Sequence, residues 1–176
     1  MKRLSVQILA IFSILFCCAS SGTCQTFDEY FVNRTLRIDY IFSGNAKHQD
    51  ISLDKLNTMP GWYGKRQRLA QVPVEGNGQI TVRPHNSDKV IYRNSFSTLF
   101  QEWLSYDEAK TVSKSFENVF LVPMPKDTVD VTVDLYNNRR EKCATFTHMV
   151  APGDILIRHI GERGITCLLY TSDAAD

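Results

Sequence analysis

Four histidines are the residues that could hold a catalytic zinc ion: His48, His85, His148 and His159. A zinc site of the HExxH type places two histidines one helical turn apart, with a glutamate directly after the first. None of these histidines is followed by glutamate, and no two of them lie three or four residues apart. His148 and His159 could meet across neighbouring strands, but the sequence offers no evident third ligand. We therefore expect no metal site and no cofactor in this chain.

Other catalytic motifs are also missing from the sequence, which has no GxSxG elbow, no GxxxxGK[ST] phosphate loop and no GxGxxG fingerprint. The glycine-rich stretch 75–78 precedes an expected strand and is interpreted as a turn. Cys143 has no CxxC partner, which favours a structural thiol over a nucleophile. Asp107 and Glu108 are adjacent on an expected helix end, where they point in different directions and cap or solvate the helix. We therefore expect no catalytic residue.

The best candidate for a binding surface is an aromatic pair beside cations in a loop, in the segment Trp62-Tyr63-Gly64-Lys65-Arg66. Such a group can stack on a glycan or anchor a protein partner. The alternative is that the aromatic side chains pack inward and close one end of the domain, as loop aromatics usually do. Trp62, Tyr63 and Arg66 are our candidate binding residues, and both interpretations stay open.

The composition argues against a dedicated nucleic-acid binder. The 176 residues include 20 Lys and Arg against 19 Asp and Glu, for a net charge of +1, and no run of basic residues occurs. Hydrophobic residues make up 43% and aromatic residues 11%, which is enough to build a core. The length suits one domain of ordinary size.

The first residues have the pattern of a secretory signal peptide. Lys2 and Arg3 precede the uncharged stretch 4–19, and small and polar residues follow as far as Cys24. The apolar centre is shorter than the roughly 20 residues of a bilayer span. We expect a signal peptide at residues 1–24, no transmembrane span after its cleavage, and a secreted, periplasmic or cell-surface protein. A lipoprotein is the competing interpretation, because Cys17 and Cys18 end the apolar run, but the bulky Phe16 fits a lipobox poorly.

Alternating apolar and polar residues predict strands through most of the remaining chain. The expected strands are 36–42, 80–83, 90–92, 116–122 (stopped by Pro123 and Pro125), 129–135, 144–150 and 155–160, with a hairpin between the second and third. One segment has helical spacing instead, with apolar residues at 96, 99, 100, 103 and 104. The pattern predicts an antiparallel β-sandwich with one short helix at about 95–105, capped by Ser95.

Several segments, taken in order, resemble a known family. They are Phe27–Phe31, Thr35–Gly44, Pro60–Arg66, Ile91–Trp103, Phe116-Glu117 and Val122–Lys126. Together they resemble the N-terminal domain of bacterial immunoglobulin-A-type zinc metallopeptidases (the IgA peptidase family), over roughly residues 27–160. In that family this region is a β-sandwich placed before a catalytic domain, which carries the zinc ligands in an HExxH motif.

The resemblance implies that residues 25–166 form a non-catalytic accessory domain of a secreted peptidase. Its partner would be the missing C-terminal catalytic domain, which would hold the zinc ion, and a protein or glycan substrate is possible. Residues 167–176 fit no family pattern and are interpreted as a non-native tail, so we expect a fragment lacking the catalytic domain. The alternative is a free-standing secreted β-sandwich that binds a glycan or a host protein.

Overall fold

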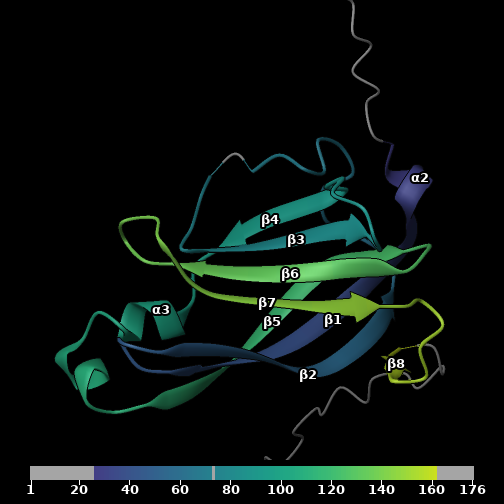
Figure 1. Ribbon diagram of the computed structural model, residues 1–176. Coiled ribbons are helices and arrows are strands. Elements are labelled where there is room, and N and C mark those ends of the chain that lie inside the picture. Colours follow the sequence, from purple (N-terminus) through teal and green to yellow (C-terminus); the bar gives the residue numbers. More distant parts are fainter. Residues whose placement is uncertain (1–25, 73, 162–176) are drawn as a thin grey trace, which may run out of the picture.

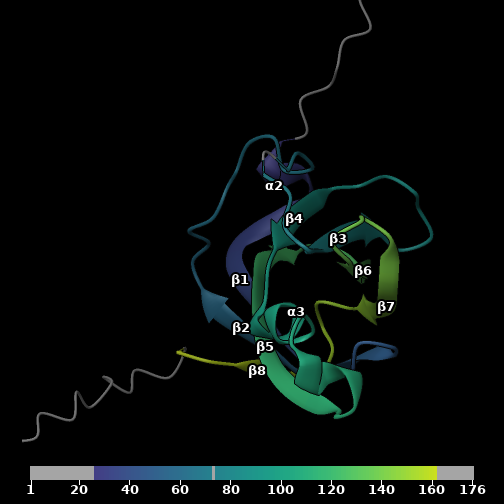
Figure 2. The same cartoon turned by 90° about the vertical axis from the view of Figure 1, so that its left-hand side faces the viewer.

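The computed structural model describes residues 26–72 and 74–161, which form two β-sheets packed face to face (Figure 1, Figure 2). Sheet A has the order β5-β1-β2-β8 and comprises β1 (Phe31–Gly44), β2 (Gln49–Pro60), β5 (Lys114–Pro125) and β8 (Ile157–His159). Sheet B has the order β4-β3-β6-β7 and comprises β3 (Gly78–Pro84), β4 (Tyr92–Phe96), β6 (Val129–Tyr136) and β7 (Lys142–Val150). Neighbouring strands are antiparallel except for β8, which runs parallel to β2. The predicted β-sandwich is therefore confirmed.

The core lies between the inner faces of the two sheets, where the period-two pattern of the sequence places it. Every second residue is buried in β6 and in the part of β1 from Leu36 to Phe42, and these residues are Leu36, Ile38, Tyr40, Phe42, Val129, Val131, Val133 and Leu135. Aromatic rings fill one end of this layer, and the ring centroids of Phe96 and Phe120 are 4.4 Å apart. Sheets packed in this way are stabilised by the apolar area that they remove from water.

The predicted helix exists but is shorter than 95–105. The helix α3 spans Leu99–Trp103, and its N-cap is Thr98, whose side chain accepts a hydrogen bond from the backbone N–H of Gln101. Ser95 is not the cap, because β4 continues through Phe96. The hydroxyl of Ser95 instead donates to the carbonyl of Gly78 at 2.9 Å, so it joins two strands of sheet B.

The predicted stop at the two prolines is wrong, because β5 continues through Pro123 to Pro125. Pro123 lies opposite Thr35 and Pro125 lies opposite Phe31 in the pairing with β1. Since β5 is an edge strand of sheet A, a residue without an N–H group is tolerated there.

The sequence analysis missed β2, because a β-bulge interrupts its alternation. Asp39 pairs with Lys55 while Tyr40 pairs with Leu53, which leaves Asp54 as an extra residue on β2. Beyond the bulge, residues 56–58 are all buried, so buried and exposed residues do not alternate there. The short helices α2 (Phe27–Tyr30) and η2 (Asp107–Lys110) were also not predicted, and the predicted strand 155–160 is reduced to β8.

Two expectations concern residues outside the described ranges: the signal peptide at 1–24 and the non-native tail at 167–176. Among the helices in the described part of the chain, none has the length and apolar character needed to cross a bilayer.

Candidate functional site

The loop after β2, which carries the candidate binding residues, is tied to β1 by hydrogen bonds. The hydroxyl of Thr35 donates to the carbonyl of Gly61 at 2.6 Å, and the backbone N–H of Trp62 donates to the side-chain oxygen of Asn33 at 3.2 Å. Gly61 has a φ of +76°, and a Cβ atom there would lie 2.8 Å from the hydroxyl of Tyr63. The positive φ favours glycine at this turn, whereas the exposed Tyr63 ring could move aside.

Trp62 and Tyr63 are neighbours in sequence but point in opposite directions. The Trp62 side chain is 6% exposed, lies edge-on to the Tyr92 ring at 6.0 Å, and donates from Nε1 to the carbonyl of Lys65 at 3.1 Å. Tyr63 is 94% exposed. Inward packing therefore describes Trp62 and not Tyr63, and binding by Tyr63 stays a prediction.

Lys65 and Arg66, the two cations next to the aromatic pair, both have partners within the domain. Lys65 Nζ donates to the carbonyls of Gln71 at 2.8 Å and Arg93 at 2.6 Å, and burial lowers the pKa of its ammonium. The Arg66 guanidinium donates to the Asn33 side chain and lies 4.5 Å from the centroid of the Phe27 ring. These contacts hold in place the backbone of the loop that carries Tyr63.

A groove of about 650 Å³ lies beside this loop, where strands of both sheets approach each other. It is lined by Thr35, Met59, Pro60, Trp62, Tyr63, Gly64, Lys65, Tyr92, Asn94 and Leu121. Most of these side chains are apolar, and Leu121 is about half exposed at 48%. Pockets with this volume and an apolar lining are the usual form of a binding site.

The structure therefore brings two of the three candidate residues to one site. Trp62 and Tyr63 line the groove, whereas Arg66 is not one of its lining residues. Sequence reasoning missed Leu121, although the signal was present. Phe120 and Val122 alternate inward in the predicted strand, so the apolar Leu121 between them must face outward.

The histidines lie in separate places of the described domain. His148 lies on β7, where its Nε2 is 2.6 Å from the hydroxyl of the buried Tyr40, and burial lowers its pKa. His85 Nδ1 is 2.9 Å from Asp130, and His159 lies on β8 of the other sheet. Within residues 26–72 and 74–161, no three His, Cys, Asp or Glu side chains converge to hold a metal ion.

Asp107 and Glu108 lie in the first turn of η2, not on α3, and both interact with their own surroundings. Glu108 accepts from Trp103 Nε1 at 2.9 Å and from Lys114 at 2.6 Å, and these two hydrogen bonds lower the pKa of its carboxyl group. Asp107 forms an exposed ion pair with Lys110 at 2.6 Å. Both carboxylates serve the local structure of this corner, as expected for adjacent acidic residues that point apart.

The family model described as Peptidase M64 N-terminus matches residues 26–147, from the residue before α2 into β7. No curated protein gives a significant match to the chain. The match agrees with the resemblance to a peptidase N-terminal domain and does not address the immunoglobulin A part of that resemblance.

Proposed function

Because the chain belongs to the family of M64 peptidase N-terminal domains, we propose that it is the non-catalytic accessory domain of a secreted zinc metallopeptidase of the IgA-peptidase type. The observation that carries the proposal is the match over residues 26–147 to a domain defined as the N-terminus of a peptidase. The catalytic residues belong to the part of the peptidase that follows this domain. Export through a signal peptide at residues 1–24 is part of the proposal, and N-terminal sequencing of the exported chain should begin at Gln25.

The zinc ion of such a peptidase has no fitting site within the described residues. The four histidines lie apart, and no three potential ligands converge in residues 26–72 and 74–161. We therefore assign the zinc ligands to the catalytic part and derive no catalytic step from this domain.

The groove beside Tyr63 is the surface that we assign to the catalytic part. The backbone N–H of Ile160 donates to the carbonyl of Thr58 at 2.9 Å, and a Cβ atom at Gly161 would lie 3.6 Å from the Pro60 ring. The chain therefore leaves β8 next to the end of β2, where Pro60 lines the groove. Figure 1 shows β8 beside β2 at the edge of sheet A. A catalytic part that follows in sequence would emerge next to this apolar surface, whose burial would stabilise the contact.

Two experiments test the accessory role. Reading the gene beyond codon 161 in genomic DNA should show a continuing frame that encodes an HExxH motif. A natural stop with no such motif downstream would refute the proposal. The purified chain should also show no zinc-dependent proteolysis, and peptidase activity of this chain alone would overturn the non-catalytic assignment.

The second candidate is a free-standing module that binds a glycan or a host protein. The observation that favours it is the exposed Tyr63 ring at the mouth of a groove of about 650 Å³. Glycan-array binding by the chain that is lost in Tyr63→Ala would support this function. Trp62→Ala is not suitable for this test, because Trp62 is buried and its loss would perturb the fold.

A further inference from the structure

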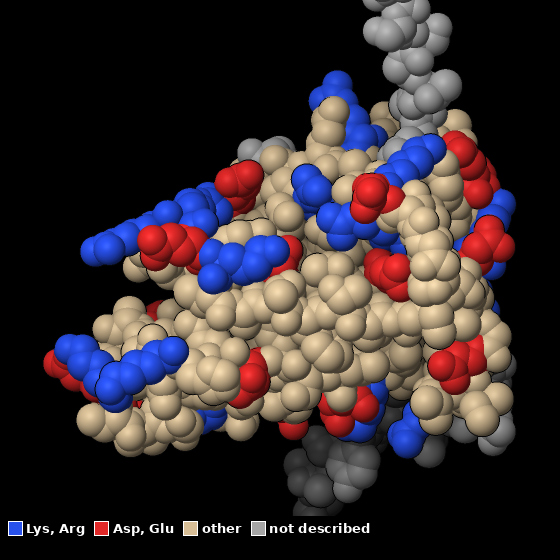
Figure 3. Space-filling view, in the orientation of Figure 1, with Lys and Arg blue, Asp and Glu red and all other residues tan. Residues whose placement is uncertain are grey.

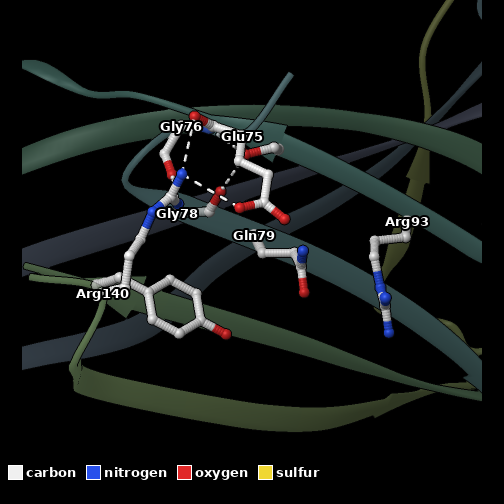
Figure 4. A pocket seen from close by; sticks show the side chains of 8 residues that line it. Glu75, Gly76, Gly78, Gln79, Arg93 and Arg140 are labelled. Carbon is white, nitrogen blue, oxygen red and sulfur yellow. Dashed lines mark hydrogen bonds and ion pairs between the residues drawn. The ribbon is translucent and has the colours of Figure 1, made fainter. Parts of the chain in front are cut away.

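A second cavity lies on sheet B, between the turn that precedes β3, the strand β4 and the end of β6 (Figure 4). Its volume is about 340 Å³, within the range of roughly 300–1,000 Å³ of small-molecule sites. The polar side chains that line it are Glu75, Gln79, Arg93, Ser95, Tyr136 and Arg140. The groove beside Tyr63 shares none of these residues, so this site is independent of the proposed function.

The wall of this cavity is fixed by close backbone packing. Ser95 lies opposite Gln79 in the β3–β4 pairing, and its hydroxyl accepts from the N–H of Gly76 at 2.6 Å. A Cβ atom at Gly76 would lie 2.1 Å from the carbonyl oxygen of Phe96, so the turn can lie this close to β4 only with glycine. The polar side chains of the cavity are therefore held on a rigid frame.

Arg140 is neutralised within the cavity. Its guanidinium donates to the carbonyl of Gly76 at 2.9 Å and forms an ion pair with Glu75 at 3.1 Å. Figure 4 shows the Arg140 side chain directed at this turn, with dashed lines to Glu75 and Gly76. In the same sheet, Asp134 Oδ1 forms an ion pair with Lys142 Nζ at 2.7 Å.

Arg93 is different, because its guanidinium makes no hydrogen bond or ion pair with the described residues. Its Nε atom is buried without a partner. Its backbone is fixed on both sides, since the N–H donates to the Leu69 carbonyl at 3.0 Å and the carbonyl accepts from Lys65. In Figure 4 the Arg93 side chain lies beside Gln79 and away from the Arg140 pair. A positioned guanidinium that has no carboxylate or carbonyl acceptor among the described residues is available to an anion that enters the cavity.

We propose that this cavity binds a carboxylate group, with Arg93 as its cation and the Gln79 amide as a second donor. A guanidinium offers parallel N–H groups that match the two oxygens of a carboxylate. The Gln79 side chain has no hydrogen-bond partner among the described residues, so it is available to the same ligand. The Tyr136 hydroxyl is not a third donor, because it donates to Asp134 Oδ2 at 3.5 Å. The volume suits one sugar or one amino acid, so the ligand is a single carboxylated unit.

Titration of the full ¹⁵N-labelled chain, followed by the amide signals of β3 and β4, tests this site. Sodium glucuronate represents a carboxylated sugar, N-acetylaspartate represents an acidic residue, and glucose at matched ionic strength is the uncharged control. We expect saturable binding of at least one carboxylate, with a Kd below about 10 mM, and no saturable binding of glucose. Binding of glucuronate alone would assign the site to acidic sugars, and binding of N-acetylaspartate alone would assign it to acidic residues.

Variants separate Arg93 from the general charge of the domain. Arg93→Met should weaken carboxylate binding about tenfold or more, and Arg93→Lys should weaken it less because the charge remains. Arg83→Met is the matched control, because Arg83 lies on β3 but lines a different cavity, and it should leave the affinity within about twofold. No saturable binding of either carboxylate, equal binding of glucose, or equal effects of Arg93→Met and Arg83→Met would overturn the proposal. All variants should retain the unfolding midpoint of the parent chain, and a lowered midpoint in Arg93→Met would make Arg93→Lys the deciding variant.

Discussion

Replacing Trp62 or Tyr63 by alanine should have very different effects, although the two residues are adjacent. Trp62 is 6% exposed and Tyr63 is 94% exposed. The Trp62 ring also packs on Tyr92 and donates to the Lys65 carbonyl. A Cβ atom at Gly64 would lie 2.3 Å from the Trp62 ring, so the loop is closely fitted around it. Trp62→Ala removes all of these contacts, and Tyr63→Ala removes almost none.

The size of the effect follows from the buried area. A buried Trp side chain removes roughly 200 Å² from water, which at about 25 cal/mol per Å² corresponds to about 5 kcal/mol. The alanine retains a small part of this, and large-to-small core substitutions of aromatic residues cost about 3–5 kcal/mol. We therefore expect Trp62→Ala to lower the free energy of unfolding by about 4 kcal/mol. Tyr63→Ala should change it by less than about 0.5 kcal/mol.

Equilibrium unfolding in urea, followed by far-UV circular dichroism, measures both effects. With an m-value of about 2 kcal/mol/M, Trp62→Ala should lower the unfolding midpoint by about 2 M. Trp62→Phe keeps the packing on Tyr92 but loses the hydrogen bond to Lys65, and should cost about 1–2 kcal/mol. A loss below about 1 kcal/mol for Trp62→Ala, or equal losses for Trp62→Ala and Tyr63→Ala, would refute the reasoning.

Three further predictions concern stability and pH. Burial lowers the pKa of His148 below its usual 6.5, so near that pH the unfolded chain binds a proton that the folded chain does not. The free energy of unfolding should therefore fall as pH drops below 6.5. A His148→Gln variant whose free energy of unfolding has the same slope between pH 7 and about 5.5 would contradict this. In Gly78→Ala the new Cβ would lie 2.1 Å from the Phe96 ring, which packs on Phe120, so we expect a loss of about 2 kcal/mol in urea unfolding. The control Gly153→Ala has no atom within 4 Å of its Cβ and should be neutral, so equal effects of the two would reject this explanation. Thr98→Ala removes the N-cap of α3 and should cost about 1 kcal/mol in the same assay. The control Thr111→Ala loses only an exposed 3.3 Å hydrogen bond to the Glu108 carbonyl and should change stability by less than about 0.5 kcal/mol.

The sequence predicted the strands whose two faces differ clearly. β6 alternates valine and leucine with aspartate and threonine, because one face packs on the core and the other meets water. It could not predict β2, where the bulge at Asp54 shifts the pattern. It also stopped β5 at Pro123, because whether a strand lies at a sheet edge is a property of the assembled sheet.

The candidate site was predicted only in part, for a related reason. Trp62 and Tyr63 have similar side chains and lie in a loop with no periodicity, so the sequence cannot show which of them points inward. Arg66 was a reasonable binding candidate until the structure placed its cation on Phe27 and Asn33. Arg93 drew no attention, because the lack of a partner for its guanidinium depends on where all the neighbouring carboxylates lie.

The distribution of charged side chains on the surface explains why the charged residues in the sequence did not indicate a binding site. Acidic and basic side chains are interspersed on the face seen in Figure 3. Exposed ion pairs such as Arg140 with Glu75 contribute little to stability. A single unpaired arginine within such a mixture is visible only when the individual contacts are known.

The most direct test of the central claim is the affinity between the purified chain and the separately purified catalytic part of its parent peptidase. Calorimetric titration should show saturable binding, and the double variant Tyr63→Ser/Leu121→Ser should weaken it about tenfold or more. The matched control is Tyr106→Ser/Met149→Ser, which replaces two half-exposed residues away from the groove and should leave the affinity within about twofold. An absence of binding, or equal weakening by the two double variants, would contradict the claim that this domain holds the catalytic part at the groove beside Tyr63.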